Sequence, residues 1–410
     1  MSGTTINIGG STNTSNLILA SSGGSISDNV VPTPEIKSFK IGLLYPEQGP
    51  IESIAPEMLK AAQEAIREVN ILPNFNFTLE AKNSQCVPSD VAPVSARELI
   101  NNGAQILVGA ACSGATSATL AEVAVPNKIP MISYAATSPS LSEISGGEYF
   151  SRSCGSDSEA SKLLSNYIYN VRNINKIIIT NVNSDYGQGY ASYMKSEFEL
   201  LGGTVLGTIE HNDASVNDAT YITTITNQMN ALATSDCALC IFGYVDTGGI
   251  IIQEKFNTIN NSNIKLYAYG DGMISTSSQF ITPVPVNSIG ASPIASSGSS
   301  YLNTSVSIDW DATFVMQVYD AMALAILSLV MGGNESRLIE NLGLITNEPG
   351  VTIYPGQLTT GIQKILEGKS INYSGASFNK LSKTPTNSYE NKNSYGLVTV
   401  NSGKTAWVSA

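Results

Sequence analysis

The sequence predicts an α/β protein made of two consecutive series of strands and helices, each series with its own mainly parallel sheet. Short apolar runs that suit buried strands alternate with stretches in which apolar residues recur at helical spacing. This alternation starts near Lys40 and begins again after Phe150. At 410 residues the chain is also long enough to form more than one domain.

The first series is predicted from strand-like apolar runs separated by helical stretches. One helix ends near Asn70 and carries an apolar stripe. A second is capped by Asp90 and stopped by Gly103, and a third begins at Ser113 and is stopped by Pro126. The expected strands are Lys40–Leu44, Phe75–Ala81, Ile106–Gly109 and Met131–Ser133.

The second series repeats the pattern. Ser156-x-x-Glu159 predicts a capping box at the start of a helix, and Asn183–Gly189 is expected to be a loop. Residues 282–305 are expected to form a passage between lobes. The expected strands are Lys176–Thr180, Thr204–Ile209, Cys237–Tyr244, Lys265–Tyr269, Asn372–Lys380 and Tyr395–Val408, and the expected helices are Tyr190–Leu201, Tyr221–Leu232, Gly248–Phe256, Asp309–Met331 and Tyr354–Leu366.

Two small-residue, hydroxyl-rich turns follow neighbouring strands of the first series. One contains Ser113, and the other is Ala135–Pro139. Ligands of open α/β sheets bind outside the carboxyl ends of the strands, and small side chains let a ligand reach backbone N–H groups. Because Ser113 opens a helix, it favours an anion. The stretch is interpreted as a carboxylate receptor, with ordinary strand–helix turns as the alternative.

Charge and composition exclude several function classes. The 33 acidic and 21 basic residues give a net charge of −12, which argues against nucleic acid or an anionic membrane as a partner. No run is long enough to span a bilayer. Residues 1–37 are rich in Ser, Thr, Gly and Asn and predict a flexible leader. This leader lacks the basic start and apolar core of a signal peptide, so a processed or truncated chain is the preferred explanation.

Motifs for catalysis and for nucleotide cofactors are missing. No GxxxxGK[ST] or GxGxxG opens a helix, so no cofactor is expected. The single histidine, His211, has no carboxylate cluster around it and is expected at the surface, so a metal site is not expected either. A hydrolase with Ser113 or a cysteine as nucleophile is a weaker alternative, because no G-x-S-x-G elbow is present. The chain is therefore not expected to be an enzyme.

The five cysteines predict one disulfide. Cys86 precedes a helix–strand unit that Cys112 ends, so a bridge between them would close this unit and contribute roughly 3–4 kcal/mol. Cys237 and Cys240 lie in an apolar strand and are interpreted as buried free thiols. Cys154 could pair with either of them.

Several short blocks occur in a characteristic order over residues 38–410. They are Cys86 to Cys112, MISYAATSP at Met131–Pro139, DYGQGY at Asp185–Tyr190, FGY at Phe242–Tyr244, GDG at Gly270–Gly272, and YPGQ followed by EGKSINYSGAS. This order resembles the type I periplasmic binding proteins, the solute receptors of ABC transporters. The leucine/isoleucine/valine-binding proteins are the most similar members.

The resemblance implies two Rossmann-like lobes with parallel central sheets, three hinge crossings and a ligand cleft between the lobes. Lobe 1 would comprise residues 38–154 plus 293–385, and lobe 2 residues 155–292 plus 386–410. The crossings are expected near Cys154–Asp157, Ala291–Ser297 and Lys383–Tyr395.

The resemblance also implies a set of ligand residues. Ser113 would bond a ligand carboxylate, and Asp271 would pair with an α-ammonium group. Asp271 lies between two glycines at a strand end, so it is expected to be exposed in the cleft, with a turn-forming role as the alternative. The expected ligand-binding residues are Ser113, Ala135, Thr137, Tyr186, Tyr244 and Asp271.

The function implied is that of an extracytoplasmic solute-binding protein of an ABC transporter, with a branched-chain or similar amino acid as ligand. The expected partners are this small molecule and an ABC permease, and the protein is expected to be a monomer. The expected location is the periplasm or, with a lipid anchor, the outer face of the cell membrane. A sensor domain of the same fold, or a receptor for a small carboxylate or amide, is the alternative.

Overall fold

The computed structural model describes residues 36–274, 287–333, 335–392, 394–401 and 404–407. Residues 1–35 of the predicted leader lie outside this part of the chain. Lys37, the last residue of that predicted leader, already belongs to the first strand.

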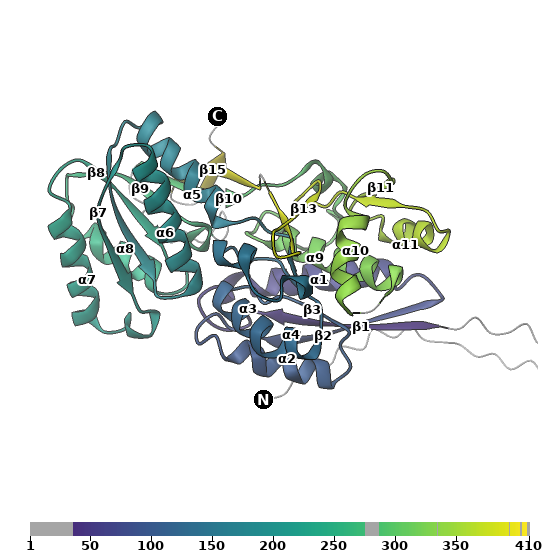
Figure 1. Ribbon diagram of the computed structural model, residues 1–410. Coiled ribbons are helices and arrows are strands. Elements are labelled where there is room, and N and C mark those ends of the chain that lie inside the picture. The colour runs from purple at the N-terminus through teal and green to yellow at the C-terminus, as the bar shows by residue number, and fades with distance from the viewer. Residues whose placement is uncertain (1–35, 275–286, 334, 393, 402–403, 408–410) are drawn as a thin grey trace, which may run out of the picture.

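Two α/β lobes lie side by side, each built on one sheet (Figure 1). The sheet of the first lobe has the order β13-β14-β5-β4-β3-β1-β2 within the described residues, and its pairs are parallel except β13 with β14. Its strands are β1 (Lys37–Tyr45), β2 (Phe75–Asn83), β3 (Ile106–Val108), β4 (Met131–Ser133), β5 (Phe150–Arg152), β13 (Leu381–Lys383) and β14 (Tyr389–Asn391).

The second lobe's sheet has the order β16-β15-β10-β9-β8-β6-β7, again within the described residues. β15 runs antiparallel to both of its neighbours, and the other pairs are parallel. Its strands are β6 (Lys176–Val182), β7 (Thr204–His211), β8 (Cys237–Phe242), β9 (Ile264–Tyr269), β10 (Ser288–Pro293), β15 (Tyr395–Asn401) and β16 (Lys404–Trp407). A small separate sheet pairs β11 (Val351–Ile353) with β12 (Ile371–Tyr373).

Helices cover the faces of both sheets (Figure 1). In the first lobe they are α1 (Ala55–Val69), α2 (Val91–Asn101), α3 (Ser113–Thr119), which continues through η2 (Leu120–Ala124) into α4 (Val125–Asn127), α9 (Val315–Met331), α10 (Glu335–Ile345) and α11 (Leu358–Leu366). In the second lobe they are α5 (Asp157–Asn166), which continues into η5 (Tyr167–Val171), α6 (Asp185–Leu200), α7 (Ala219–Leu232) and α8 (Gly248–Asn257). Short helical turns are η1 (Glu52–Ile54), η3 (Pro139–Glu143), η4 (Gly147–Tyr149), η6 (Asp213–Ser215), η7 (Asp271–Met273) and η8 (Ser297–Tyr301).

The helix α9 forms the centre of the first lobe. It is apolar on nearly all sides and buried along most of its length, as a helix packed between other elements must be. Its one carboxylate, Asp320, accepts hydrogen bonds from the Tyr373 hydroxyl at 2.7 Å and from the backbone N–H groups of Ala376 and Ser377 at 2.9 and 2.7 Å. This buried aspartate therefore fixes the chain that follows β12.

The predicted loop Asn183–Gly189 is largely helical, so that prediction was wrong. α6 begins at Asp185 because the Ser184 side chain accepts a hydrogen bond from the Gly187 N–H and caps the helix. The cap outweighs the low helix propensity of Gly187 and Gly189, the third and fifth residues of the helix. As a result Tyr186 lies on a rigid helix start instead of a loop.

Two further predictions need correction, and a third was incomplete. The long helix begins at Val315 instead of Asp309, and residues 335–345 form the unpredicted helix α10. The expected passage at 282–305, of which residues 282–286 lie outside the described part, does contain a crossing between the lobes, but the strand β10 precedes it. His211 was expected at the surface but is fully buried at the end of β7, where burial lowers its pKa to about 4.

The chain crosses between the lobes after β5, after β10 and between β14 and β15. The second and third crossings touch, because the Ile294 N–H donates to the Ser394 carbonyl at 2.7 Å. The predicted lobe limit at residue 385 falls between β13 and β14, two strands of the same sheet.

A buried arginine lies at the first crossing. Arg152 is fully buried, and its Nη2 lies 2.7 Å from Oε2 of Glu390 on β14. Its Nη1 donates to the carbonyls of Ala136 and Ser138, both at 2.9 Å. Arg152 therefore joins β5, the third crossing and the turn after β4.

We expect Arg152→Met to lower the free energy of unfolding by about 3–5 kcal/mol, because it removes the buried cation of Glu390 and leaves only the exposed Lys392, whose Nζ lies 3.8 Å from Glu390 Oε1. Urea denaturation measures this loss. Arg67→Met is the control, since Arg67 is 57% exposed beside Glu64 and its removal should cost about 1 kcal/mol or less. Similar losses in the two variants would contradict the role given to Arg152.

Candidate functional site

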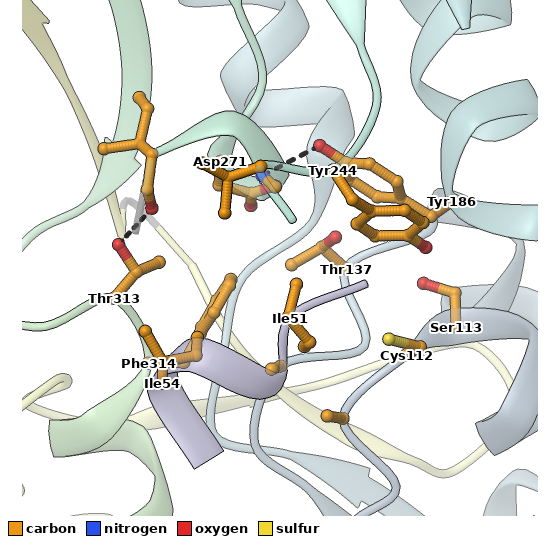
Figure 2. Close-up of a pocket in the computed structure, with 15 residues that line it drawn as sticks. Ile51, Ile54, Cys112, Ser113, Thr137, Tyr186, Tyr244, Asp271, Thr313 and Phe314 are labelled. Atoms are coloured by element: carbon orange, nitrogen blue, oxygen red, sulfur yellow. Dashed lines mark hydrogen bonds between the residues drawn. The ribbon is translucent and has the colours of Figure 1, made fainter. Parts of the chain in front are cut away.

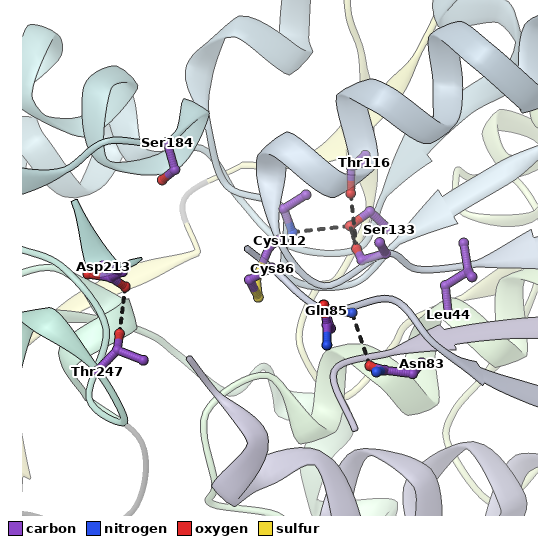
Figure 3. Close-up of a disulfide and its surroundings, with 12 residues drawn as sticks. Leu44, Asn83, Gln85, Cys86, Cys112, Thr116, Ser133, Ser184, Asp213 and Thr247 are labelled. Carbon is purple, nitrogen blue, oxygen red and sulfur yellow. Dashed lines mark hydrogen bonds between the residues drawn. A yellow bond between two sulfur atoms is a disulfide. The ribbon is translucent and has the colours of Figure 1, made fainter. Parts of the chain in front are cut away.

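The predicted disulfide is confirmed, and it lies at the N-terminal end of α3. Cys86 and Cys112 are bonded to each other, so the chain after β2 is covalently tied to the residue before Ser113 (Figure 3). Cys154, Cys237 and Cys240 are buried and unpaired in the structure. The disulfide therefore anchors the backbone that presents the Ser113 hydroxyl.

Hydrogen bonds connect the two turns that the sequence singled out. The Ser113 hydroxyl oxygen accepts from the Ser138 N–H at 3.1 Å. The Ser133 hydroxyl donates to the Ala110 carbonyl at 2.6 Å and accepts from the Ala136 N–H at 3.1 Å. The ends of β3 and β4 thus form one connected surface, as expected for adjacent parallel strands.

Two stacked tyrosines form the wall that the second lobe contributes. Tyr186 on α6 and Tyr244 after β8 stack with their ring centroids 5.3 Å apart (Figure 2). The Tyr186 hydroxyl accepts a hydrogen bond from the Gly272 N–H at 3.0 Å, which fixes the ring against the turn that carries Asp271. The ring of Tyr190 packs edge-on against the ring of Tyr186.

Asp271 lies directly after β9 and is buried, at 2% exposure, so the expectation of an exposed carboxylate was wrong. Its Oδ2 accepts from the Tyr395 hydroxyl at 2.7 Å. Burial raises the pKa of Asp271 to about 6, although hydrogen bonds from Tyr395 and Tyr186 act to lower it. A cation beside this carboxylate would favour its charged form.

One cavity between the lobes collects all the predicted ligand residues. Ser113, Ala135 and Thr137 line it from the first lobe. The second lobe contributes Tyr186, Tyr244 and Asp271 (Figure 2). The other lining residues are mostly apolar: Ile51, Ile54, Ala111, Cys112, Val245, Gly272, Ile274, Thr313 and Phe314.

The apolar part of the cavity wall was not predicted. Ile51 directly precedes η1 and Ile54 is its last residue. Ile274 follows η7, and Phe314 precedes α9. Most of these residues belong to short turns without periodicity, so no sequence signal marks them. The Thr313 hydroxyl donates to the Ile274 carbonyl and is thereby engaged within the wall (Figure 2). No Lys, Arg or His from the described residues lines the cavity.

Direct contacts join the lobes on two sides of the cavity. The Ser138 hydroxyl donates to the Asp185 carbonyl at 3.0 Å. On another side, the Ser53 N–H donates to an Asp246 carboxylate oxygen at 3.1 Å, and the Asp246 N–H donates to the Pro50 carbonyl at 3.3 Å. The arrangement is therefore a closed one.

We expect the contribution of Asp271 to the free energy of unfolding to fall as the pH rises from about 4 to about 6. The pKa of this group is about 6 in the folded protein and near 3.8 in an unfolded chain, so the folded state binds more protons in this window. Asp271→Asn removes the effect, and its stability should exceed that of the wild type by up to about 3 kcal/mol above pH 6.

Urea denaturation of both proteins at pH 4 and pH 7 tests this expectation. The informative quantity is the difference between wild type and variant, because other carboxylates titrate in the same window in both proteins. A difference that stays constant between the two pH values would show that Asp271 does not titrate there.

The sequence matches a known family. The sequence model of the periplasmic binding proteins matches residues 38–252, just over half of the chain. The Leu/Ile/Val-binding protein BraC3 of Rhizobium johnstonii is 26% identical over 244 residues, which are 58% of this chain and 62% of that protein. The leucine-specific-binding protein of Salmonella typhimurium is 26% identical over 176 residues, 42% of this chain and 44% of that protein. The matched region thus spans less than two thirds of these relatives.

Solved structures share the fold. LivJ of Streptococcus pneumoniae, in complex with isoleucine, has a TM-score of 0.68 at 19% identity, and the match covers 91% of this chain and 100% of that chain. A solute-binding protein of an ABC transporter from Rhodopseudomonas palustris, in complex with 3,4-dihydroxybenzoic acid, has a TM-score of 0.63 at 16% identity, covering 91% and 96%. The resemblance predicted from the short blocks is confirmed, and the chain belongs to the periplasmic binding protein family, with the type I fold.

Proposed function

We propose that the protein is an extracytoplasmic solute-binding protein that takes up an amino acid with an aliphatic side chain between its lobes and delivers it to an ABC permease. The observation that carries the proposal is the combination of groups in one cavity. Hydroxyls lie at one part of the wall, a buried carboxylate at another, and aliphatic side chains at a third. A free amino acid presents the three complementary groups.

The ligand carboxylate would bind at the turns of the first lobe. The Ser113 hydroxyl oxygen already accepts from Ser138, so its proton is available to donate to an anion. Ala135 and Thr137 contribute backbone groups from the neighbouring turn, and Thr137 adds a hydroxyl. Such an arrangement can hold a carboxylate without an arginine.

The ligand ammonium would pair with Asp271. Asp271 is buried beside the cavity, and a charge that is removed from water needs a partner of opposite sign. An aromatic acid such as the one bound by the Rhodopseudomonas protein would bring a second negative charge to this carboxylate. For this reason we favour an amino acid over a simple carboxylate.

The ligand side chain would pack against the aliphatic wall. Ile51, Ile54, Val245 and Ile274 offer branched side chains, and Phe314 adds a ring. The Thr313 hydroxyl donates to the Ile274 carbonyl, so in this arrangement its proton is not available to a polar ligand side chain. The names of the curated relatives, Leu/Ile/Val-binding and leucine-specific-binding proteins, support the same ligand class.

Support for a location outside the cytoplasm comes from the disulfide between Cys86 and Cys112, because such bonds persist in oxidising compartments. No helix of the described residues is both long and apolar enough to cross a membrane. We further propose that the protein acts as a monomer and that the permease recognises its closed, ligand-bound form.

A thermal-shift screen tests the ligand class. We expect leucine, isoleucine or valine to raise the melting temperature, because a ligand at one hundred times its dissociation constant adds about 2.7 kcal/mol of apparent stability. Aspartate and lysine, whose side chains would meet the aliphatic wall, should give no shift. A shift with 3,4-dihydroxybenzoate alone would move the assignment to an aromatic acid receptor.

We expect Asp271→Asn to weaken leucine binding by about 2–5 kcal/mol, the usual range for breaking a desolvated charge pair. 4-Methylpentanoate, which is leucine without its amino group, should bind the wild type poorly and lose little more in the variant. Calorimetry on the four combinations of protein and ligand measures the coupling. Equal losses for the two ligands would show that Asp271 does not hold the ammonium.

A further inference from the structure

One loop of the second lobe carries both cavity residues and a contact to the first lobe. This loop joins β8 to α8, and its residues Tyr244 and Val245 line the cavity. The next residue, Asp246, is exposed and does not line the cavity. The position of Asp246 is therefore tied to that of the cavity wall, although its side chain lies outside the cavity.

The Asp246 side chain caps a helix of the other lobe. η1 continues without a break into α1, and the N–H groups in the first turn of a helix have no partners inside the helix. The residues before η1 and before α1, Ile51 and Ile54, have side chains that cannot accept a hydrogen bond. The Ser53 N–H donates instead to Oδ2 of Asp246 at 3.1 Å. A carboxylate is both a favoured acceptor and a favoured charge at this place.

Each side of this contact is fastened to its own lobe. In the second lobe the Thr247 hydroxyl donates to a carboxylate oxygen of Asp213 at 2.6 Å, which holds the loop to the turn after β7 (Figure 3). In the first lobe η1 is the start of α1, which packs against α9 and β2. Because neither side can follow the other, the cap is lost when the lobes part.

The cap also forms where the aliphatic wall of the cavity is assembled. Ile51 and Ile54 come from the capped turn, and Val245 comes from the loop that provides the cap. The wall for a ligand side chain is therefore complete only when the cap is in place. The Asp246 N–H donates to the Pro50 carbonyl at 3.3 Å, and this second bond remains when only the side chain of Asp246 is changed.

We propose that Asp246 is a positioning residue for ligand binding, whose carboxylate caps η1 only while the lobes are closed and so favours the closed form over the open one. This inference rests on the proposed function for the identity of the cavity as the ligand site. A ligand that binds the closed form gains affinity by the factor by which the cap favours closure. Because Asp246 does not line the cavity, this factor is the same for every ligand that closes the lobes.

Asp246→Ala removes the acceptor. We expect it to weaken the binding of L-leucine by about fivefold, as the loss of one N-cap acceptor implies. The melting temperature without ligand should stay within about 1 °C of the wild type, because the cap is absent from the open form that prevails without ligand. Calorimetry and thermal unfolding of the full chain at pH 7.5 measure the two quantities.

Asp246→Asn separates the cap from the charge. An asparagine side chain accepts from the same N–H, so this variant should bind leucine within about twofold of the wild type. If Asp246 acted on the ligand ammonium through its charge, the asparagine variant would lose as much affinity as the alanine variant. That result overturns the proposal.

Asp246→Lys is a second variant in case the alanine variant does not fold. Its ammonium group cannot accept a hydrogen bond and is unfavourable at a helix N-terminus, so the loss of affinity should be at least as large. A lysine variant that binds leucine like the wild type overturns the proposal. So does the failure of both variants to fold, because a contact that is absent from the open form is not needed for folding.

Asp218→Ala is the matched control. Asp218 is also exposed and also caps a helix, because its Oδ1 accepts from the N–H groups of Thr220 and Tyr221 at 2.8 and 3.4 Å. This cap and its helix α7 both belong to the second lobe. Its loss should therefore lower the melting temperature without ligand by about 2 °C and leave leucine affinity within about twofold. An Asp246→Ala variant that behaves like this control overturns the proposal.

The outcomes also separate this inference from the proposed function. If the wild type binds 3,4-dihydroxybenzoate but not leucine, and Asp246→Ala weakens that binding about fivefold, the amino acid assignment fails and the role of Asp246 stands. If leucine binds and Asp246→Ala leaves its affinity within about twofold, the assignment stands and the role of Asp246 fails. A wild type that binds neither probe overturns the role of Asp246.

Discussion

The interactions of Arg152 hold together the parts of the structure on which the site depends. This buried guanidinium connects β5, Glu390 on β14 and the carbonyls of the turn after β4. The first and third crossings and the turn that contains Thr137 therefore share one cation. The position of the turn after β4, which lines the cavity, is thus coupled through Arg152 to the path of the chain between the lobes.

Two buried aspartates show how differently the same residue can be used. Asp320 receives donors from a hydroxyl and from two backbone N–H groups, and in return it fixes a loop of the first lobe. Asp157 is as deeply buried, but among the described residues no backbone N–H donates to its carboxylate, and the nearby Thr137 hydroxyl only partly offsets the rise in its pKa. Only the first arrangement compensates for the loss of water, and at Asp157 burial and the neighbouring Asp271 raise the pKa of the carboxyl well above its ordinary value.

The sequence predicted the sheets and the gathering of the proposed ligand residues around one cavity because both follow from local rules. Apolar runs mark the strands, and parallel strands bring the residues at their carboxyl ends to one edge, as with Ser113 and Thr137. The start of α6 was missed because glycines and a serine cap give opposite signals there. The burial of His211 and Asp271 was missed because it depends on tertiary contacts that no spacing reveals. Phe314 was missed for the same reason.

The burial of the cavity wall has a kinetic consequence. None of the six predicted ligand residues is more than 8% exposed, and Ser138 and Asp246 bond across the lobes beside them. A bound molecule therefore cannot leave through this arrangement, and its residence time is set by how often the lobes part. Tight contacts at the site would lengthen that time only by holding the lobes together. A partner that pulls the lobes apart would shorten it without touching the ligand.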